Sequence, residues 1–342
     1  MGLNKRLLGG ISSGPADTAF FKTVTYTGNW NGSNTNTITV GFQPDFIAIK
    51  CRSHSDSHHD YDSTRGMGKP LYFDSTAAES SASDHLDVTS TGFTLTTDNV
   101  NQSGRTFVAW CWRANGGTTS SNTNGSTTST VQASSLSGFS IVKYTGTGSN
   151  ATIGHGLSTA PDWIIMKNMD RAGYGWLVYH QAISEENYMV LNTGAAQQDQ
   201  ASIFNDTAPT SSVFSVGTDT FGNYNGDDYI AYCWHDVSGF SKFGSYTGNG
   251  STTGPEVNIG FTPDFVLFKR ADVGDSWRIF DSARSTSNTR EEYLDPNSNA
   301  AEATSQFNTV DFITNGFQPR CIGSTMNNSG GTYTYAAFKT TH

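Results

Sequence analysis

The sequence predicts an all-β protein built from three tandem antiparallel β-sandwich modules of about 100 residues each. Three observations support this prediction: the composition, a set of sequence motifs that occurs three times along the chain, and strand-like apolar runs inside each copy. Aromatic residues make up 12% of the 342 residues and charged residues only 15%, and there are 36 glycines. Aromatic residues at this level argue against disorder, and a chain rich in Gly, Ser, Thr and Asn is a poor helix former.

Two short motifs recur in the same order in each copy. An opening strand ends in Tyr-Thr-Gly, at residues 26–28, 144–146 and 246–248. A Pro-Asp pair then leads into an apolar run that ends in Lys, at residues 44–50, 161–167 and 263–269. Repetition of both order and spacing indicates triplication of one supersecondary unit.

A closing strand recurs at residues 106–113, 228–235 and 332–339. In the first copy, alternation places Phe107 and Cys111 on one face and Trp110 and Trp112 on the other. Both faces are apolar, so this strand is expected to be covered on both sides. Shorter apolar segments, such as 71–73, 93–95 and 213–216, are separated by clusters of turn residues.

These features divide the chain into five parts: an N-terminal segment (1–21), module 1 (22–114), a Ser/Thr/Asn/Gly-rich linker (115–138), module 2 (139–238) and module 3 (239–342). The polar, low-complexity linker is expected to act as a flexible or surface-laid tether. Each module is expected to bury its own core, with a jelly-roll, lectin-like or immunoglobulin-like topology. The sequence does not decide among these topologies.

Charge and hydropathy exclude several partners. The net charge of −10 argues against nucleic acid, because phosphate binding needs clustered Lys and Arg. No run of 18 apolar residues occurs, so no membrane partner is expected, and no secretion signal is recognisable.

The densest cluster of possible metal ligands is His54, His58, His59 and Asp60. Imidazoles and carboxylates at this density could bind Zn²⁺. The corresponding stretches of modules 2 and 3 contain no histidine, so a solvated polar loop is the favoured interpretation. No metal and no cofactor are expected.

Two further sets are candidates for surface contact with a glycan. Asp62 with Arg65, and Asp281 with Arg284, could bind sugar hydroxyls, although a turn closed by a local Asp–Arg pair is favoured. His180 occupies the corresponding place in module 2. The second set consists of the tryptophans near predicted loops, Trp30, Trp176 and Trp277. The aromatic residues that repeat with the module are expected to be core residues instead.

No pattern for catalysis stands out. The sequence has no Gly-x-Ser-x-Gly elbow and no His-Glu-x-x-His, and the repeated Asp45, Asp162 and Asp264 follow Pro, which suggests a cap or turn role. Cys111 and Cys233 occupy one repeated position and are expected to be buried thiols. A disulfide between Cys51 and Cys321 is an alternative that we do not favour. The protein is therefore expected not to be an enzyme.

The motifs also carry a resemblance. The opening Leu-Asn-Lys-Arg-Leu-Leu-Gly of residues 3–9, the Tyr-Thr-Gly segments, the Pro-Asp-aromatic strands and the Val-Ala-Trp-Cys-Trp of residues 108–112 resemble a repeat family of marine bacteriophages. Its members are uncharacterised or tail-fibre-like virion proteins. The resemblance implies a location on an exposed part of a virion assembled in the host cytoplasm.

The expected function is thus that of a structural tail or fibre component that contributes to host attachment. Its expected partners are other phage structural proteins of tail or capsid and a host-surface glycan, and a homo-oligomer is expected in the particle. The segment that would anchor the chain contains Leu3, Lys5, Arg6, Leu7 and Leu8. The alternatives are a capsid decoration or head-fibre protein, a glycan-binding or glycan-degrading tail enzyme, and a secreted lectin.

Overall fold

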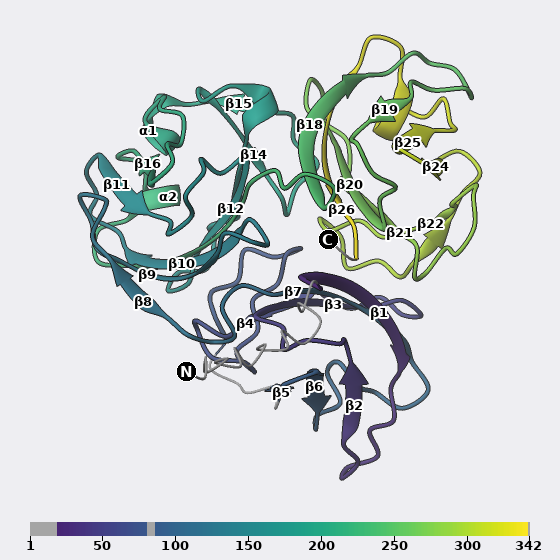
Figure 1. Cartoon of the computed structure of the whole chain (residues 1–342), viewed down its shortest axis with the longest axis horizontal. Helices are drawn as coiled ribbons and strands as arrows, with labels where there is room; N and C mark the ends of the chain where they lie inside the picture. Colours follow the sequence, from purple (N-terminus) through teal and green to yellow (C-terminus); the bar gives the residue numbers. More distant parts are fainter. Residues whose placement is uncertain (1–18, 81–85, 341–342) are drawn as a thin grey trace, which may run out of the picture.

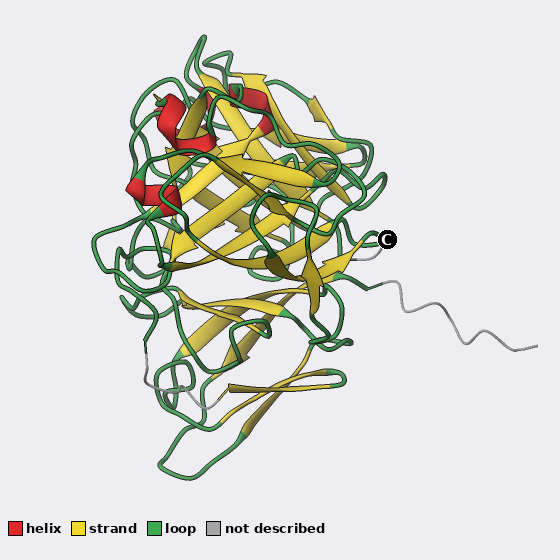
Figure 2. Ribbon diagram, turned by 90° about the vertical axis from the view of Figure 1, so that its left-hand side faces the viewer, coloured by secondary structure: helices red, strands yellow, loops and turns green. Residues whose placement is uncertain are grey.

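A computed structural model describes residues 19–80 and 86–340 of the chain. Antiparallel strands dominate it, and the short helices lie at the periphery of the molecule (Figure 2). The prediction of an all-β protein is confirmed.

The strands of the first repeat are β1 (Phe21–Thr27), β2 (Asn36–Thr39), β3 (Phe46–Cys51), β4 (His59–Asp62), β5 (Leu86–Thr89), β6 (Gly92–Leu95) and β7 (Thr106–Trp112). The second region contains β8 (Ser120–Asn122), β9 (Ser129–Ser134), β10 (Phe139–Thr145), β11 (Ala151–Gly154), β12 (Trp163–Asn168), β13 (Trp176–His180), η1 (Gln181–Ile183), β14 (Asn187–Val190), β15 (Gln198–Asp199), α1 (Ala201–Phe204), β16 (Val213–Val216), α2 (Thr220–Asn223) and β17 (Asp228–Trp234). The third contains β18 (Ser241–Thr247), β19 (Val257–Asn258), β20 (Phe265–Arg270), β21 (Arg278–Asp281), β22 (Glu292–Tyr293), β23 (Ala303–Thr304), β24 (Val310–Ile313), β25 (Gly316–Pro319), α3 (Ser324–Asn327) and β26 (Thr332–Phe338).

One sheet order recurs in the three repeats. The orders β1-β7-β3-β4, β10-β17-β12-β13 and β18-β26-β20-β21 each place the closing strand between the opening strand and the strand after Pro-Asp. We call these the inner sheets. A smaller sheet faces each of them: β2-β6-β5, β11-β16 and β19-β25-β24. Each inner sheet and the smaller sheet that faces it form one lobe. The three lobes, which are repeats 1, 2 and 3 in chain order, surround a common centre (Figure 1).

The inner sheets are buried on both faces, as the sequence predicts for the closing strand. Phe107 and Cys111 of β7 pack into the core of their own lobe, with Phe93 of the small outer sheet. Trp110 and Trp112, on the opposite face of β7, join a core to which all three repeats contribute. We call this the central core. The expectation that each module hides only its own core is therefore wrong, because every inner sheet has a second apolar face that only the other two repeats can cover.

The segment predicted to be a linker, 115–138, differs from expectation. Its strands β8 and β9 extend the inner sheet of the second repeat, and β9 pairs with β10 from Phe139↔Ser134 to Tyr144↔Ser129. Its polar side chains are compatible with an edge position, where one face meets water. This segment is thus part of the fold and is not a free tether.

The repeated Tyr-Thr-Gly motif closes each lobe in the same way. The hydroxyls of Tyr26, Tyr144 and Tyr246 donate to the backbone carbonyls of Val100, Gly222 and Met326, at 2.6–2.7 Å. The residue after each of these carbonyls is a buried asparagine (Asn101, Asn223 and Asn327), and its Oδ1 accepts the N–H of the residue after the motif glycine. The glycine itself lies against the backbone: a Cβ on Gly28 would stand 2.1 Å from the carbonyl oxygen of Gln102.

We therefore predict that Gly28→Ala lowers the free energy of unfolding by about 1–3 kcal/mol, because the new methyl group must displace backbone. Thr27→Ala changes the exposed neighbouring residue and should alter stability by about 0.5 kcal/mol or less. Chemical denaturation of both variants measures the difference. Equal stabilities of the two variants would contradict the proposed close approach.

Candidate functional site

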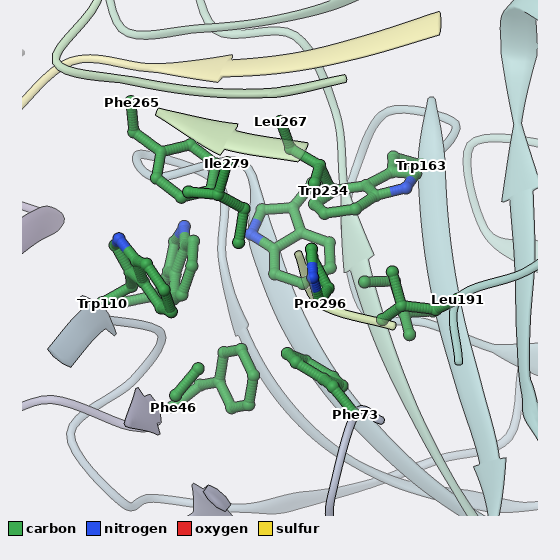
Figure 3. Close-up of a pocket in the computed structure, with 13 residues that line it drawn as sticks. Phe46, Phe73, Trp110, Trp163, Leu191, Trp234, Phe265, Leu267, Ile279 and Pro296 are labelled. Carbon is green, nitrogen blue, oxygen red and sulfur yellow. The ribbon is translucent and has the colours of Figure 1, made fainter. Parts of the chain in front are cut away.

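The central core is the place where the repeats meet, and its aromatic side chains point toward one another (Figure 3). Phe46, Trp163 and Phe265 follow the three Pro-Asp pairs and are at most 4% exposed. The rings of Trp163 and Trp234 stack with centroids 4.6 Å apart. The prediction that the repeating aromatic residues are core residues is confirmed.

A cavity of about 30 Å³ remains among these rings. It is lined by apolar side chains from all three repeats, including Ala48, Leu191, Ile279 and Pro296. A water molecule there would find no hydrogen-bond partner, so a dry void is expected. Its volume is far below that of an ordinary ligand pocket.

A ring of hydrogen bonds closes around the central core. His58 Nε2 donates to the carbonyl oxygen of Asp295 at 3.1 Å, which joins repeat 1 to repeat 3. Trp176 Nε1 donates to the carbonyl oxygen of Tyr72 at 2.8 Å, and Trp277 Nε1 donates to that of Val190 at 3.2 Å. The three donors occupy corresponding positions, 13 or 14 residues after the Pro-Asp aspartate. Each repeat thus donates to one neighbour in a cyclic order.

In a second ring of hydrogen bonds, each repeat bonds to its other neighbour. Asp62 Oδ2 accepts from the hydroxyl of Tyr232 at 2.8 Å, and Asp281 Oδ2 accepts from Trp110 Nε1 at 3.1 Å. His180, at the corresponding place in repeat 2, instead donates from Nε2 to a carbonyl oxygen of repeat 3, at 3.1 Å.

The replacement of a carboxylate by imidazole at position 180 has a structural reason. Trp110 and Tyr232 lie opposite Ala48 and Ile165 in their sheets, and the residue at the same register in repeat 3 is Ala336, opposite Leu267. Alanine offers no side-chain donor to a carboxylate. An imidazole N–H can bond to the backbone carbonyl that remains.

Two buried arginines stabilise the carboxylates of the second ring. Arg65 donates to Asp62 Oδ2 and to the carbonyl oxygen of Asp60, and Arg284 makes the equivalent bonds to Asp281 and Ile279. The predicted local Asp–Arg pairs are present, but they are buried inside the molecule.

Three buried lysines repeat as well. Nζ of Lys50 donates to the carbonyl oxygen of Asn299 in repeat 3, and Nζ of Lys269 donates to that of Gly194 in repeat 2, both at 3.3 Å. Nζ of Lys167 stays within its repeat and donates to the carbonyl oxygen of Tyr174 at 2.7 Å. Burial lowers the pKa of Lys167 and of Lys269 to about 8.

The carboxylates of the three Pro-Asp pairs accept backbone N–H groups just after the closing strands. Asp45 accepts the backbone N–H of Ala114 at 2.7 Å, Asp162 accepts that of Asp236, and Asp264 accepts that of Thr340. These are cap-like bonds, as the position after Pro predicts.

The residues predicted for glycan contact are mostly inaccessible. Asp62, Arg65, Asp281 and Arg284 are buried, and so are Trp176 and Trp277. Their prediction as surface contacts is wrong, because they belong to the junctions between repeats. Trp30 is half-buried, so the prediction for this residue stays open.

The histidine-rich stretch is not a solvated loop. His54 is exposed, whereas His58, His59 and Asp60 are buried. His59 Nδ1 lies 3.2 Å from the hydroxyl of Tyr61, on the face of β4 opposite to Asp60. Within residues 19–80 and 86–340, no group of three potential ligands has a geometry that would hold a metal ion.

The four cysteines are free and buried. Cys111 and Cys233 are the buried thiols that the sequence predicts, and burial raises the pKa of each. Cys51 and Cys321 lie in the separate cores of repeats 1 and 3, so the alternative of a disulfide between them is wrong.

Asp60 departs from the repeated pattern. It lies opposite Ala48 on β4, whereas Val178 and Ile279 occupy the equivalent register in the other repeats. Both of its carboxyl oxygens are buried, and the backbone of Phe73 offers the carboxylate a hydrogen bond. Burial raises its pKa well above the ordinary value, with a further contribution from nearby Asp74.

Sequence reasoning missed the two rings of bonds. A usable signal existed, since His58, Trp176 and Trp277 fall at nearly the same distance after Pro-Asp and all carry a ring N–H. What the sequence alone could not provide was the acceptor, which in each case is a backbone carbonyl of another repeat.

Fold and junctions together define a three-repeat β protein closed around one shared core. The chain belongs to the family described as a domain of unknown function, DUF7483, whose model matches residues 16–341. That one model spans all three repeats. No curated protein and no solved structure matches the chain. The helices among residues 19–80 and 86–340 are short, and none of them could span a lipid bilayer.

We predict that Asp60→Val, which introduces the residue found in repeat 2, stabilises the protein by about 1–3 kcal/mol at pH 7. The unfolded chain releases the Asp60 proton near pH 4, whereas the folded chain keeps it because its pKa is raised. The wild type therefore loses stability as pH rises above about 4, and the gain from Val should shrink toward pH 4.

Urea denaturation at several pH values between 4 and 8 measures this gain. Asp60→Asn is the matched control, because it keeps a buried polar group but removes its titration. A gain from Val that is equal at pH 4 and pH 7 would show that Asp60 is ionised in the folded protein.

Proposed function

We propose that this protein is a non-enzymatic structural component of a bacteriophage particle, in the tail or a fibre, that contributes to attachment to the host surface. One observation carries the non-enzymatic part of the proposal. Several of the carboxylates, imidazoles and lysines that are candidates for chemistry instead bond across the junctions between repeats, such as Asp281 with Trp110 and His58 with Asp295.

The location rests on the family resemblance and agrees with the architecture. Bonds in both directions around a dry aromatic core make one rigid unit, whose loops are left for contact with partners. Rigid presentation lowers the entropy lost on binding, which favours a scaffold that presents loops to a surface.

Repeat 3 offers the most suitable contact surface. Phe307 and Ile322 are 64% and 57% exposed. They lie on neighbouring loops, since a Cβ on Gly323 would stand 2.9 Å from the carbonyl oxygen of Phe307. Exposed aromatic and aliphatic side chains that lie together are typical of interaction sites. This supports the idea that repeat 3 faces the host.

The anchoring residues Leu3, Lys5, Arg6, Leu7 and Leu8 lie outside the described residues. The proposed boundary of the anchor at residue 21 needs correction, however. Phe20 and Phe21 are buried in the central core, so they belong to the folded unit. The deletion that tests anchoring is therefore residues 2–18, with Phe20 retained.

Labelled antibody on intact particles, combined with quantitative mass spectrometry of the purified virion, tests the location. A few copies at the tail tip support the proposal, whereas hundreds over the head would favour a decoration protein. Deletion of residues 2–18 should abolish incorporation while the purified protein stays folded. Release of reducing sugars from host polysaccharide by the purified protein would identify a glycan-degrading enzyme instead.

The contact surface has its own test. We predict that Phe307→Ser with Ile322→Ser lowers phage adsorption at equilibrium at least about ten-fold, because loss of two hydrophobic contacts costs more than 1.4 kcal/mol. Leu136→Ser removes an equally exposed side chain of the second region and should leave adsorption unchanged. Equal adsorption by both variants would exclude these loops as the contact.

A further inference from the structure

The three junctions between repeats are not chemically equal. The bonds described above between repeats 1 and 2 use the Trp176 indole and the Asp62 carboxylate. Both junctions with repeat 3 include an imidazole: His58 from repeat 1 and His180 from repeat 2. In each case a ring nitrogen meets a backbone carbonyl, so the imidazole must carry its proton on Nε2.

His180 has no place for a second proton. Its Nδ1 lies 3.2 Å from the backbone N–H of Ala182 and accepts that hydrogen. Protonation would set two N–H groups against each other. The side chains around it are uncharged: Trp163, Leu267, Trp277, Thr334, Tyr335 and Ala336. Burial accordingly lowers the pKa of His180 to about 4.

His58 is equally ill-suited to a positive charge. Its Nδ1 is buried, and its ring stacks on Trp110 with centroids 6.3 Å apart. The backbone of Ser298 favours the protonated ring, but burial outweighs this contribution. The charged groups that face it are Lys50, which opposes protonation, His59, and the carboxyl of Asp74, which accepts the backbone N–H of His58. Burial, with a contribution from Lys50, lowers the pKa of His58 to about 3.

We propose that His58 and His180 form an acid-sensitive latch, which holds repeat 3 against repeats 1 and 2 at neutral pH and releases it on acidification. The latch depends on the two positions where imidazole replaces a group that does not gain a proton in this range. The junction between repeats 1 and 2 lacks these imidazoles and should stay closed.

The direction follows from proton linkage. An imidazole exposed by opening has a pKa near 6.5, whereas the closed latch keeps both rings neutral. The open form therefore binds more protons between pH 6.5 and about 4, and the closed form loses stability as pH falls through this range. Each ring can raise the opening equilibrium constant by up to about ten-fold per pH unit, and both together by about 100-fold.

Two carboxyls, of Asp74 and of the Asp295 whose backbone carbonyl bonds to His58, act in the opposite direction. Burial raises the pKa of Asp74 and of Asp295, so protonation of these groups favours the closed form as pH falls. A wild-type pH profile is therefore compared with variants that remove only the imidazoles.

Three indole N–H groups report on the three junctions of the full-length protein. Trp277 bonds across the junction of repeats 3 and 2, Trp110 across that of repeats 1 and 3, and Trp176 across that of repeats 2 and 1. Their hydrogen exchange is measured by NMR on ¹⁵N-labelled protein. The rates of Trp277 and Trp110 are divided by that of Trp176, which cancels the intrinsic pH dependence of exchange.

Between pH 6.5 and pH 5, both ratios are expected to rise about 10- to 100-fold in the wild type. With His58→Gln and His180→Gln, whose amides can donate to the same carbonyls without titrating, the ratios should change less than about two-fold. His54→Gln, at an exposed position, should behave like the wild type.

The proposal is contradicted if the wild-type ratios do not rise, or if the exchange rate of Trp176 rises together with those of the other two indoles. It is also contradicted if the double variant responds to pH like the wild type. Should the double variant fail to fold, the imidazole ¹⁵N shifts of the wild type decide. His58 and His180 must both appear as neutral Nε2–H tautomers in the closed protein at pH 5, and a protonated ring in the closed state excludes the proposal.

Discussion

The burial of each inner sheet on both faces is the constraint on which the rest of this structure depends. A strand such as β7 directs Cys111 into its own lobe and Trp110 toward the middle of the molecule. Covering the second face requires apolar surface from elsewhere, and the other two repeats supply it. The lobes therefore pack around one another. The protein is one folded unit although its sequence consists of three tandem repeats.

A shared aromatic core orders the repeats only loosely, since dispersion and hydrophobic contacts have little directionality. The hydrogen bonds around that core supply the direction. His58, Trp176 and Trp277 each reach a carbonyl of one neighbour, and Asp62, His180 and Asp281 reach the other neighbour. A buried donor without its acceptor would cost about 1–3 kcal/mol, so wrong arrangements of the lobes are penalised.

Departures from the threefold pattern are concentrated in the junctions. Ala336 removes a side-chain donor and is matched by His180, and Asp60 places a carboxyl where the other repeats have Val178 and Ile279. Each departure puts a titratable group into a dry environment. These positions place the pH-sensitive groups of the proposed latch and of Asp60 in repeats 1 and 2, where the repeated pattern is broken.

The sequence by itself determined the all-β class, the recurrence of one set of motifs and the two apolar faces of the closing strand, because period-two alternation and repeated motifs are local properties of the chain. It also indicated the cap role of Asp45 and the buried state of Cys111. Only the tertiary structure decided that Trp176, Trp277 and Asp281 are junction residues rather than surface contacts, and that residues 129–134 form a strand. The physical reason is that a second apolar face, or a ring N–H, does not specify its partner. That partner lies in another repeat, and closure of the three lobes brings it within hydrogen-bonding distance.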